Sequence, residues 1–213
     1  MFPTAEVRWF WQGEVPDAAL TWLTTRPGDA PSKDTRTDHY LLVNATDTLG
    51  VKLREGNIEL KQRMGPPRLE SFADRAQGLV ELWTKWSFDL ARERSVLHQL
   101  TDSPAWIGIK KTRWLKAYRV TDQGNVEPLP KDEDPTQLCT VEITRVTALP
   151  ETQRDPWWTL GLEASGNETR LIQTLIRTAV GLLDASFPAA MTTENSYSYP
   201  QWLRLPHSTE TGT

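Results

Sequence analysis

TDTLGVKLREGNIELKQR, residues 46–63, predicts two short strands joined by a tight turn. Apolar and charged residues alternate on both sides of Glu55-Gly56-Asn57, which supplies the turn. Successive side chains of a strand point to opposite faces, so this hairpin has one apolar face and one charged face. The charged face carries Lys52, Arg54, Glu59, Lys61 and Arg63.

The same alternation returns along the chain and predicts further strands of the same kind. These candidate strands are residues 6–11, 38–42, 78–88, 106–120, 138–146 and 157–164. An ordinary antiparallel sheet turns its charged face to water, whereas a sheet closed into a barrel encloses one of its faces. Both arrangements satisfy the alternation, and its repetition favours the closed sheet.

The remaining segments are predicted as helices and loops around the sheet. Pro16 lies at the first turn of a short helix that ends at Thr24. Residues 165–168, Ser-Gly-Asn-Glu, have the pattern of a capping box, and the helix that follows continues to about Ala185. An apolar stripe along this helix predicts that it packs against the outside of the sheet. We also expect a helix at 89–100, loops at 25–37 and at 68–77, the latter with a helical turn, a loop or short hairpin at 122–136, and a docking segment at 196–203.

Length and composition restrict the class of protein. The chain has 213 residues, enough for one large β domain or two small ones, and residues 206–213 are expected to form a disordered tail. A net charge of -4 argues against DNA binding by a basic outer surface, although a basic cavity inside an acidic shell is compatible with it. Cys139 is the only cysteine, so no intramolecular disulfide and no cysteine zinc site can form. Without a secretory signal or a membrane span, the protein is expected to be cytoplasmic, with no membrane contact.

In its order of elements the chain resembles the CYTH-like family, also called triphosphate tunnel metalloenzymes. The matching pieces are the Glu6-Val7-Arg8 strand, the basic strands around Leu53 and Leu60, the Lys111-Thr112-Arg113 strand, the acidic strands around Glu142 and Glu163, the helix after them, and Ser196-Tyr197. The resemblance implies an α+β fold: an antiparallel β barrel, or tunnel, of about eight strands with helices packed outside. It also implies a single domain over residues 1–205 with lysines, arginines and glutamates inside.

The family's metal-binding signature is incomplete in this chain. The first strand usually carries two glutamates and a lysine at alternate positions, where this sequence has Glu6, Arg8 and Phe10. The later strands usually contribute paired acids, but Thr144 accompanies Glu142 and Gly161 accompanies Glu163. The resemblance therefore leaves Glu6, Glu142 and Glu163 as the candidate ligands for Mg²⁺ or Mn²⁺. Because a cation beside a metal repels it, we expect Arg8 to pair with Glu6 or to bind the ligand directly, and expect no tight divalent-cation site in the free protein.

The basic side chains of the charged faces form a candidate site for phosphate groups. Arginine makes planar, bidentate contacts to phosphate oxygens, and lysine supplies a movable point charge. The candidate ligand-binding residues are Arg8, Lys52, Arg54, Lys61, Arg63, Lys85, Lys111 and Arg113. Glu59 and Glu81 could instead neutralise these charges and leave a polar interior that only supports a barrel. Among the tryptophans, only Trp83 and Trp157 are expected on the charged faces of the strands that carry them.

Three functions follow from these alternatives. The first is binding of a phosphate-rich anion (triphosphate, polyphosphate or a nucleotide) with weak or no hydrolysis. The second is an active metal-dependent triphosphatase in which three carboxylates suffice. The third is a non-catalytic scaffold whose acidic loops, at residues 122–136 and 147–156, contact a protein partner.

Overall fold

The computed structural model describes residues 2–43, 45–90, 100, 102–130, 137–150 and 155–205. Most of these residues belong to strands. The strands are β1 (Phe2–Gln12), β2 (Ser32–Leu41), β3 (Leu49–Arg54), β4 (Asn57–Arg63), β5 (Arg68–Phe72), β6 (Ala76–Asp89), β7 (Trp106–Val120), β8 (Val126–Pro128), β9 (Leu138–Ala148) and β10 (Trp157–Ser165). The helices are α1 (Asp17–Thr25), η2 (Glu168–Arg170), α3 (Leu171–Leu182), η3 (Thr193–Asn195) and α4 (Tyr199–Leu203).

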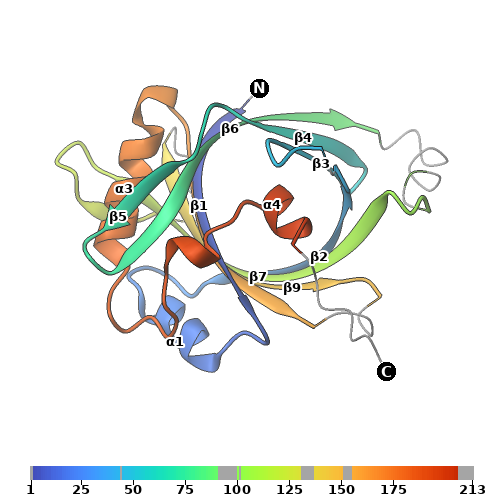
Figure 1. Ribbon diagram of the computed structural model, residues 1–213. Coiled ribbons are helices and arrows are strands. Elements are labelled where there is room, and N and C mark those ends of the chain that lie inside the picture. Colours follow the sequence, from blue (N-terminus) through green and yellow to red (C-terminus); the bar gives the residue numbers. More distant parts are fainter. Residues whose placement is uncertain are drawn as a thin grey trace.

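Eight of the strands close into an antiparallel barrel (Figure 1). They pair in the order β1, β10, β9, β7, β2, β3, β4 and β6, and β6 returns to pair with β1. β5 pairs with β6 and β8 pairs with β7, both outside this ring. The expected closed antiparallel barrel is therefore confirmed, and each barrel strand has a neighbour on both sides.

The β3–β4 hairpin forms as its sequence predicts. Glu55 and Gly56 have positive φ angles of 50° and 84°, the conformation that a two-residue hairpin turn needs. Lys52 then stands opposite Glu59, and Leu53 stands opposite Ile58. This register places the charged residues of both strands on one face.

The main hydrophobic core lies outside the barrel wall, between the strands and the surrounding helices. α3 contacts β1, β7, β9 and β10, and Figure 1 shows it on the outer side of the ring. Its buried residues Leu171, Leu175 and Ala179 pack in the same cluster as Trp9 and Leu160 of the strands. The predicted packing of this helix outside the sheet is thus observed. No helix within the described ranges is both long and apolar enough to cross a membrane.

A second apolar cluster lies inside the barrel and receives the C-terminal segment. Phe10, Ile109 and Val146 of the wall pack there with Trp202 of α4. The Phe10 and Trp202 rings are stacked, with 5.2 Å between centroids and 11° between planes. Figure 1 shows α4 within the outline of the ring. The predicted docking segment therefore fills part of the interior with aromatic side chains.

Two predicted loops are partly strands. β2 begins at Ser32, inside the expected loop 25–37. β5 occupies residues 68–72 of the expected loop 68–77. Residues 32–37 are mostly exposed and polar, so apolar alternation could not reveal them. Their strand conformation comes from pairing with β7, which reaches as far as Leu115. β5 likewise forms by pairing with β6.

The start and end of the long helix also differ from prediction. The cap residue is Asn167 rather than Ser165. The Asn167 side chain accepts a hydrogen bond from the Thr169 backbone N–H at 3.0 Å. One 3₁₀ turn, η2, precedes α3, which ends at Leu182 rather than near Ala185. Most of the predicted 89–100 helix, residues 131–136 and the predicted tail 206–213 lie outside the described residues. The remainder of the predicted 122–136 loop or hairpin contains β8.

Gly78 of β6 provides a test of this packing. A Cβ at position 78 would lie 2.6 Å from Val7 Cγ2 and 2.7 Å from Trp9 Cζ2, both in the buried core. Gly78→Ala should lower the free energy of unfolding by about 1–3 kcal/mol, the usual effect of overpacking. Urea unfolding of the purified variant measures this loss.

Gly108→Ala on β7 is the matched control. The three atoms nearest to a Cβ at position 108 all belong to the Leu149 side chain, the closest at 3.1 Å, and that residue is 38% exposed and able to move. The change should stay within about 0.5 kcal/mol. Equal losses in the two variants would contradict the packing described for Gly78.

Candidate functional site

The barrel encloses a polar cavity with a volume of about 150 Å³. Every one of the eight barrel strands contributes at least one lining residue, and α4 adds Tyr199 and Pro200. A water molecule needs roughly 10–15 Å³ of such volume, so the cavity has room for several waters or for a small polar ligand. The charged faces of the strands therefore meet around one enclosed space.

Positive charge is in excess in this cavity, although the chain as a whole is acidic. Its basic lining residues are Arg8, Arg36, Lys52, Arg54, Lys61, Lys85, Lys111 and Arg113. Its acidic lining residues are Glu6, Glu59, Glu142 and Glu163. The lining thus carries four more cations than anions, and three more once the fully buried Asp38 behind it is counted.

Glu59 on β4 joins three of these cations. Its carboxylate lies 3.1 Å from Lys52 Nζ and 3.3 Å from Lys85 Nζ, and it also contacts Arg54. Burial alone would raise the pKa of Glu59, but Lys52, Arg54 and Lys85 hold it below its ordinary value. The predicted neutralising role of Glu59 is therefore present in the structure.

Asp38 on β2 is the second shared carboxylate. It is fully buried and lies 3.0 Å from Lys111 Nζ, 3.1 Å from Arg36 Nε and 3.8 Å from Lys52 Nζ. Burial opposes ionisation, yet the nearby Lys111, Lys52 and Arg36 lower the pKa of Asp38 well below its ordinary value. Lys111 also donates a hydrogen bond to the Tyr40 hydroxyl at 2.5 Å.

These carboxylates do not fully compensate the buried lysines. Burial lowers the pKa of Lys111 to about 8, even though Asp38 and Glu142 oppose the change. Burial and the charge of Lys111 likewise lower the pKa of Lys52 to about 8. Burial lowers the pKa of Lys61 as well. Each of these ammonium groups would be stabilised by further negative charge in the cavity.

Glu142 on β9 is the third shared carboxylate, and it holds Arg8. It accepts hydrogen bonds from Arg8 Nη1 at 3.0 Å, Arg113 Nη1 at 3.1 Å and the Thr144 hydroxyl at 2.6 Å. Burial would raise the pKa of Glu142, but Arg8 and Arg113 lower it to about 2. Arg8 therefore pairs with Glu142 rather than with Glu6, which contacts Lys61 instead.

Strand register explains this choice of partner. Arg8 stands opposite Gly161 on β10, and Gly161 stands opposite Glu142 on β9, so the three residues form one row across three strands. A Cβ at position 161 would lie 2.5 Å from Arg8 Cζ. The absence of a side chain at Gly161 is what allows the guanidinium group to cross β10 and reach Glu142.

Two of the three candidate metal ligands, Glu6 and Glu142, are paired with cations. Glu6 stands opposite Glu163 in the β1–β10 pairing, with Glu142 one row away. Lys61 contacts Glu6, and Arg8 and Arg113 contact Glu142. Within the described ranges, no three histidine, cysteine, aspartate or glutamate side chains are grouped so that they could hold a metal ion. As they stand, these residues do not fit a divalent cation.

The other predicted site residues fall into two groups. Lys52, Arg54, Lys61, Lys85, Lys111, Arg113 and Trp83 line the cavity with Arg8. Arg63 does not line it, because Glu81 and Asp47 hold its guanidinium at 2.7 and 3.1 Å. Trp157 packs edge-on against Trp202 instead, with 6.1 Å between ring centroids.

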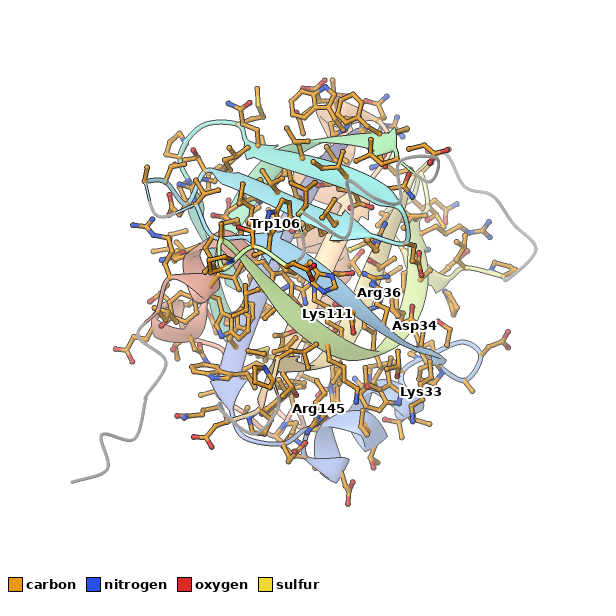
Figure 2. The ribbon with its side chains drawn as sticks, turned by 90° about the vertical axis from the view of Figure 1, so that its right-hand side faces the viewer. Lys33, Asp34, Arg36, Trp106, Lys111 and Arg145 are labelled. Carbon is orange, nitrogen blue, oxygen red and sulfur yellow. The ribbon has the colours of Figure 1, made fainter. Side chains whose placement is uncertain are left out.

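Sequence reasoning missed Arg36, Asp38 and Tyr199 as site residues. Arg36 was assigned to a loop, although Asp34, Arg36 and Asp38 follow the period-two pattern of a strand face. Figure 2 shows Arg36 and Lys111 near the middle of the β2–β7 wall and Lys33 farther along it. Tyr199 on α4 lies beneath two cations: Lys111 Nζ is 3.8 Å and Arg8 Cζ 5.0 Å from its ring centroid.

Comparisons with known proteins give distant similarity in structure only. No protein-family model and no curated protein matches the chain. A conserved hypothetical protein from Pyrococcus furiosus is similar over 92% of this chain and 98% of its own, with 14% identity and a TM-score of 0.41. HpAC1 from Hippeastrum, for which a dominant triphosphatase activity is described, is similar over 81% of this chain and 83% of its own, with 11% identity and a TM-score of 0.36. Because both TM-scores are low, the description of the barrel rests on its strand pairing.

The depressed lysine pKa values predict a pH dependence of stability. Below pH 8, Lys52 and Lys111 are charged in both the folded and the unfolded chain. As the pH rises from about 8 toward the ordinary lysine value of 10.5, the folded state loses these protons first. The free energy of unfolding should therefore increase over this range, by up to about 1.4 kcal/mol per pH unit for each proton.

Lys111→Met should flatten this increase in the free energy of unfolding. The substitution removes one buried charge, and it also removes the repulsion by which Lys111 lowers the pKa of Lys52. Urea unfolding at several pH values from neutral to just below ~10, where tyrosine begins to titrate, measures the slope. Lys33→Met, at an exposed position of β2, should leave the slope unchanged. A parent protein whose stability falls over this range would contradict the burial of charge described for the cavity.

Proposed function

We propose that this protein binds a phosphate-rich anion, such as triphosphate, polyphosphate or a nucleotide, inside its barrel, with weak or no hydrolysis. The observation that carries the proposal is the excess of positive charge in the enclosed cavity. A triphosphate brings several negative charges and many acceptor oxygens into a small volume. Guanidinium and ammonium groups held around such a volume form strong, charge-assisted hydrogen bonds to it.

The ligand-free site has groups that an anion would satisfy. Lys52 and Lys111 have pKa values of about 8 because the acids around them do not balance their burial. An anion in the cavity would supply the missing negative charge.

The arrangement of the acids favours binding without a metal ion. Mg²⁺ and Mn²⁺ need several oxygen ligands, and the oxygens of Glu6 and Glu142 are directed to Lys61, Arg8 and Arg113. A metal-activated or metal-oriented water is a main source of rate in the hydrolysis of phosphate esters and anhydrides. We therefore expect the basic side chains to bind and orient the anion, with little turnover.

Titration with tripolyphosphate in the presence and absence of Mg²⁺ tests this function. Calorimetry should detect binding that persists when a chelator removes divalent ions. Turnover that requires Mg²⁺, measured as phosphate release, would support the metal-dependent triphosphatase instead. If tripolyphosphate does not bind under either condition, the remaining hypothesis is the non-catalytic scaffold that contacts a protein partner.

Arg54→Ala and Arg113→Ala test the contribution of the cavity directly. Each should weaken tripolyphosphate binding roughly tenfold or more, because a hydrogen bond to a charged group contributes about 1.5–3 kcal/mol. Lys33→Ala is the matched control: it removes one cation from an exposed position of β2 and should leave the affinity unchanged.

Thermal melts of the same variants separate ligand binding from structural support. Without Arg54, Glu59 still contacts Lys52 and Lys85, and without Arg113, Glu142 still contacts Arg8. Neither substitution should therefore unfold the barrel, and tripolyphosphate should raise the melting temperature of the parent more than that of the variants. Strongly destabilised variants, together with a parent that tripolyphosphate does not protect, would end the proposal.

Anion binding should also take up protons. The pKa values of Lys52 and Lys111 are about 8 in the free protein, and a bound polyanion would raise them toward or above the ordinary value of 10.5. Affinity should consequently fall as the pH rises through 8. Calorimetry in two buffers of different ionisation enthalpy, slightly above pH 8, measures the uptake, and Lys111→Met should reduce it. Binding with no proton uptake at this pH would show that the anion does not contact these lysines.

A further inference from the structure

Arg8 lies beside the acids of two barrel strands, β9 and β10. Its guanidinium donates to Glu142 at 3.0 Å and to the Thr159 hydroxyl at 2.8 Å. Glu142 and Glu163 both raise the pKa of Arg8 against the effect of burial. Glu6 lies two residues earlier on the same face of β1, directly opposite Glu163. Carboxylates from β9 and β10 therefore act on this one cation, and Glu6 of β1 lies in the neighbouring row.

The guanidinium also occupies a space that no other side chain fills. Gly161 has no Cβ, and the atoms closest to the place of that Cβ are Cζ, Nη1 and Nη2 of Arg8, at 2.5 to 2.7 Å. The side-chain exposures of Arg8 and Glu142 are both 11%, so water screens their pairing little. Since arginine stays protonated at any ordinary pH, this charge is permanent.

We propose that Arg8 is a resident cation that replaces a divalent metal ion among Glu6, Glu142 and Glu163. Its guanidinium pairs with Glu142 and lines the cavity beside these carboxylates, where it presents a fixed positive charge to the anion. Anion binding is then independent of metal because the protein carries the bridging cation itself. The metal-independent binding of the anion rests on the proposed function, whereas the exclusion of a metal ion by Arg8 does not.

Two properties of the site make Arg8, rather than Lys61 or Arg113, the residue that excludes a metal ion. Lys61 lies against Glu6, and Arg113 lies between Glu142 and the exposed Asp34, so each of these cations sits at the margin of the acid group. Arg8 alone of the three shares a row with both Gly161 and Glu142. Removing its charge therefore frees Glu142 Oε1 from its ion pair, while Arg113 keeps Oε2, and it leaves room at Gly161 for an ion.

Binding of Mn²⁺ alone tests the exclusion of metal. Arg8→Glu and Arg8→Gln each replace the guanidinium by a side chain with an oxygen ligand, and Arg8→Gln keeps the test available if the carboxylate variant does not fold. Both variants, checked for folding by circular dichroism, should bind Mn²⁺ roughly tenfold or more tightly than the parent in an electron paramagnetic resonance titration. Adding Glu142→Gln to either variant should abolish the gain.

Lys33→Glu is the control for net charge, because it makes the same change in charge as Arg8→Glu at an exposed position of β2. It should bind Mn²⁺ no better than the parent. Folded Arg8 variants that gain no affinity for Mn²⁺ would overturn the proposal, and so would a parent that binds Mn²⁺ as tightly as they do. An equal gain in Lys33→Glu would overturn it as well, because net charge alone would then account for the effect.

A second titration, with tripolyphosphate, connects Arg8 to anion binding. The parent should bind equally well with Mn²⁺ or with a chelator, whereas Arg8→Glu should need Mn²⁺ to recover affinity. If the parent binds no tripolyphosphate at all, the proposed function fails while the Mn²⁺ result still decides the role of Arg8. If Arg8→Glu binds the anion without metal as well as the parent does, the bridging role of Arg8 is wrong and the proposed function stands.

Discussion

Carboxylates that are shared by several cations hold the interior of this barrel together. Glu59 contacts three basic side chains, Asp38 contacts three, and Glu142 contacts two. Breaking a buried pair leaves an uncompensated charge, so each shared acid fixes several strands relative to one another. The contacts of Glu142, for example, join β1, β7 and β9. The same sharing leaves cations in excess, because one carboxylate cannot neutralise three of them.

This imbalance connects stability to function. Burial of Lys52 and Lys111 without enough negative charge opposes folding, and their depressed pKa values express that opposition. The apolar packing outside the wall and the aromatic cluster around Phe10 and Trp202 offset it. A site that is electrostatically strained when empty is relieved by a ligand of opposite charge. In the proposed function, part of the free energy of anion binding would therefore come from relief of this strain.

One missing side chain organises the acidic side of the cavity. Gly161 lets Arg8 cross from β1 to Glu142, and Arg8 in turn leaves Glu6 to Lys61. α4 completes the arrangement, since Tyr199 offers its ring face to both Arg8 and Lys111. The C-terminal segment thus contacts the same cations that would receive the anion. The interior is closely packed at this point, because the Arg8 guanidinium fills the space that a side chain at position 161 would need.

Period-two alternation by itself determined which residues of each strand share a face, and so predicted the β3–β4 hairpin and most of the residues of the basic lining. The repetition of this alternation along the chain favoured a closed sheet with the charged face inside. The apolar stripe of α3 likewise determined its packing outside the wall. Only the tertiary structure decided the partners: Arg8 with Glu142, which is 134 residues away, and Arg36 with Asp38 in a strand that pairing with β7 creates. Alternation fixes the face of a residue but not its register against a distant strand. Register follows from closure of the whole ring, and it selects which opposite charges meet.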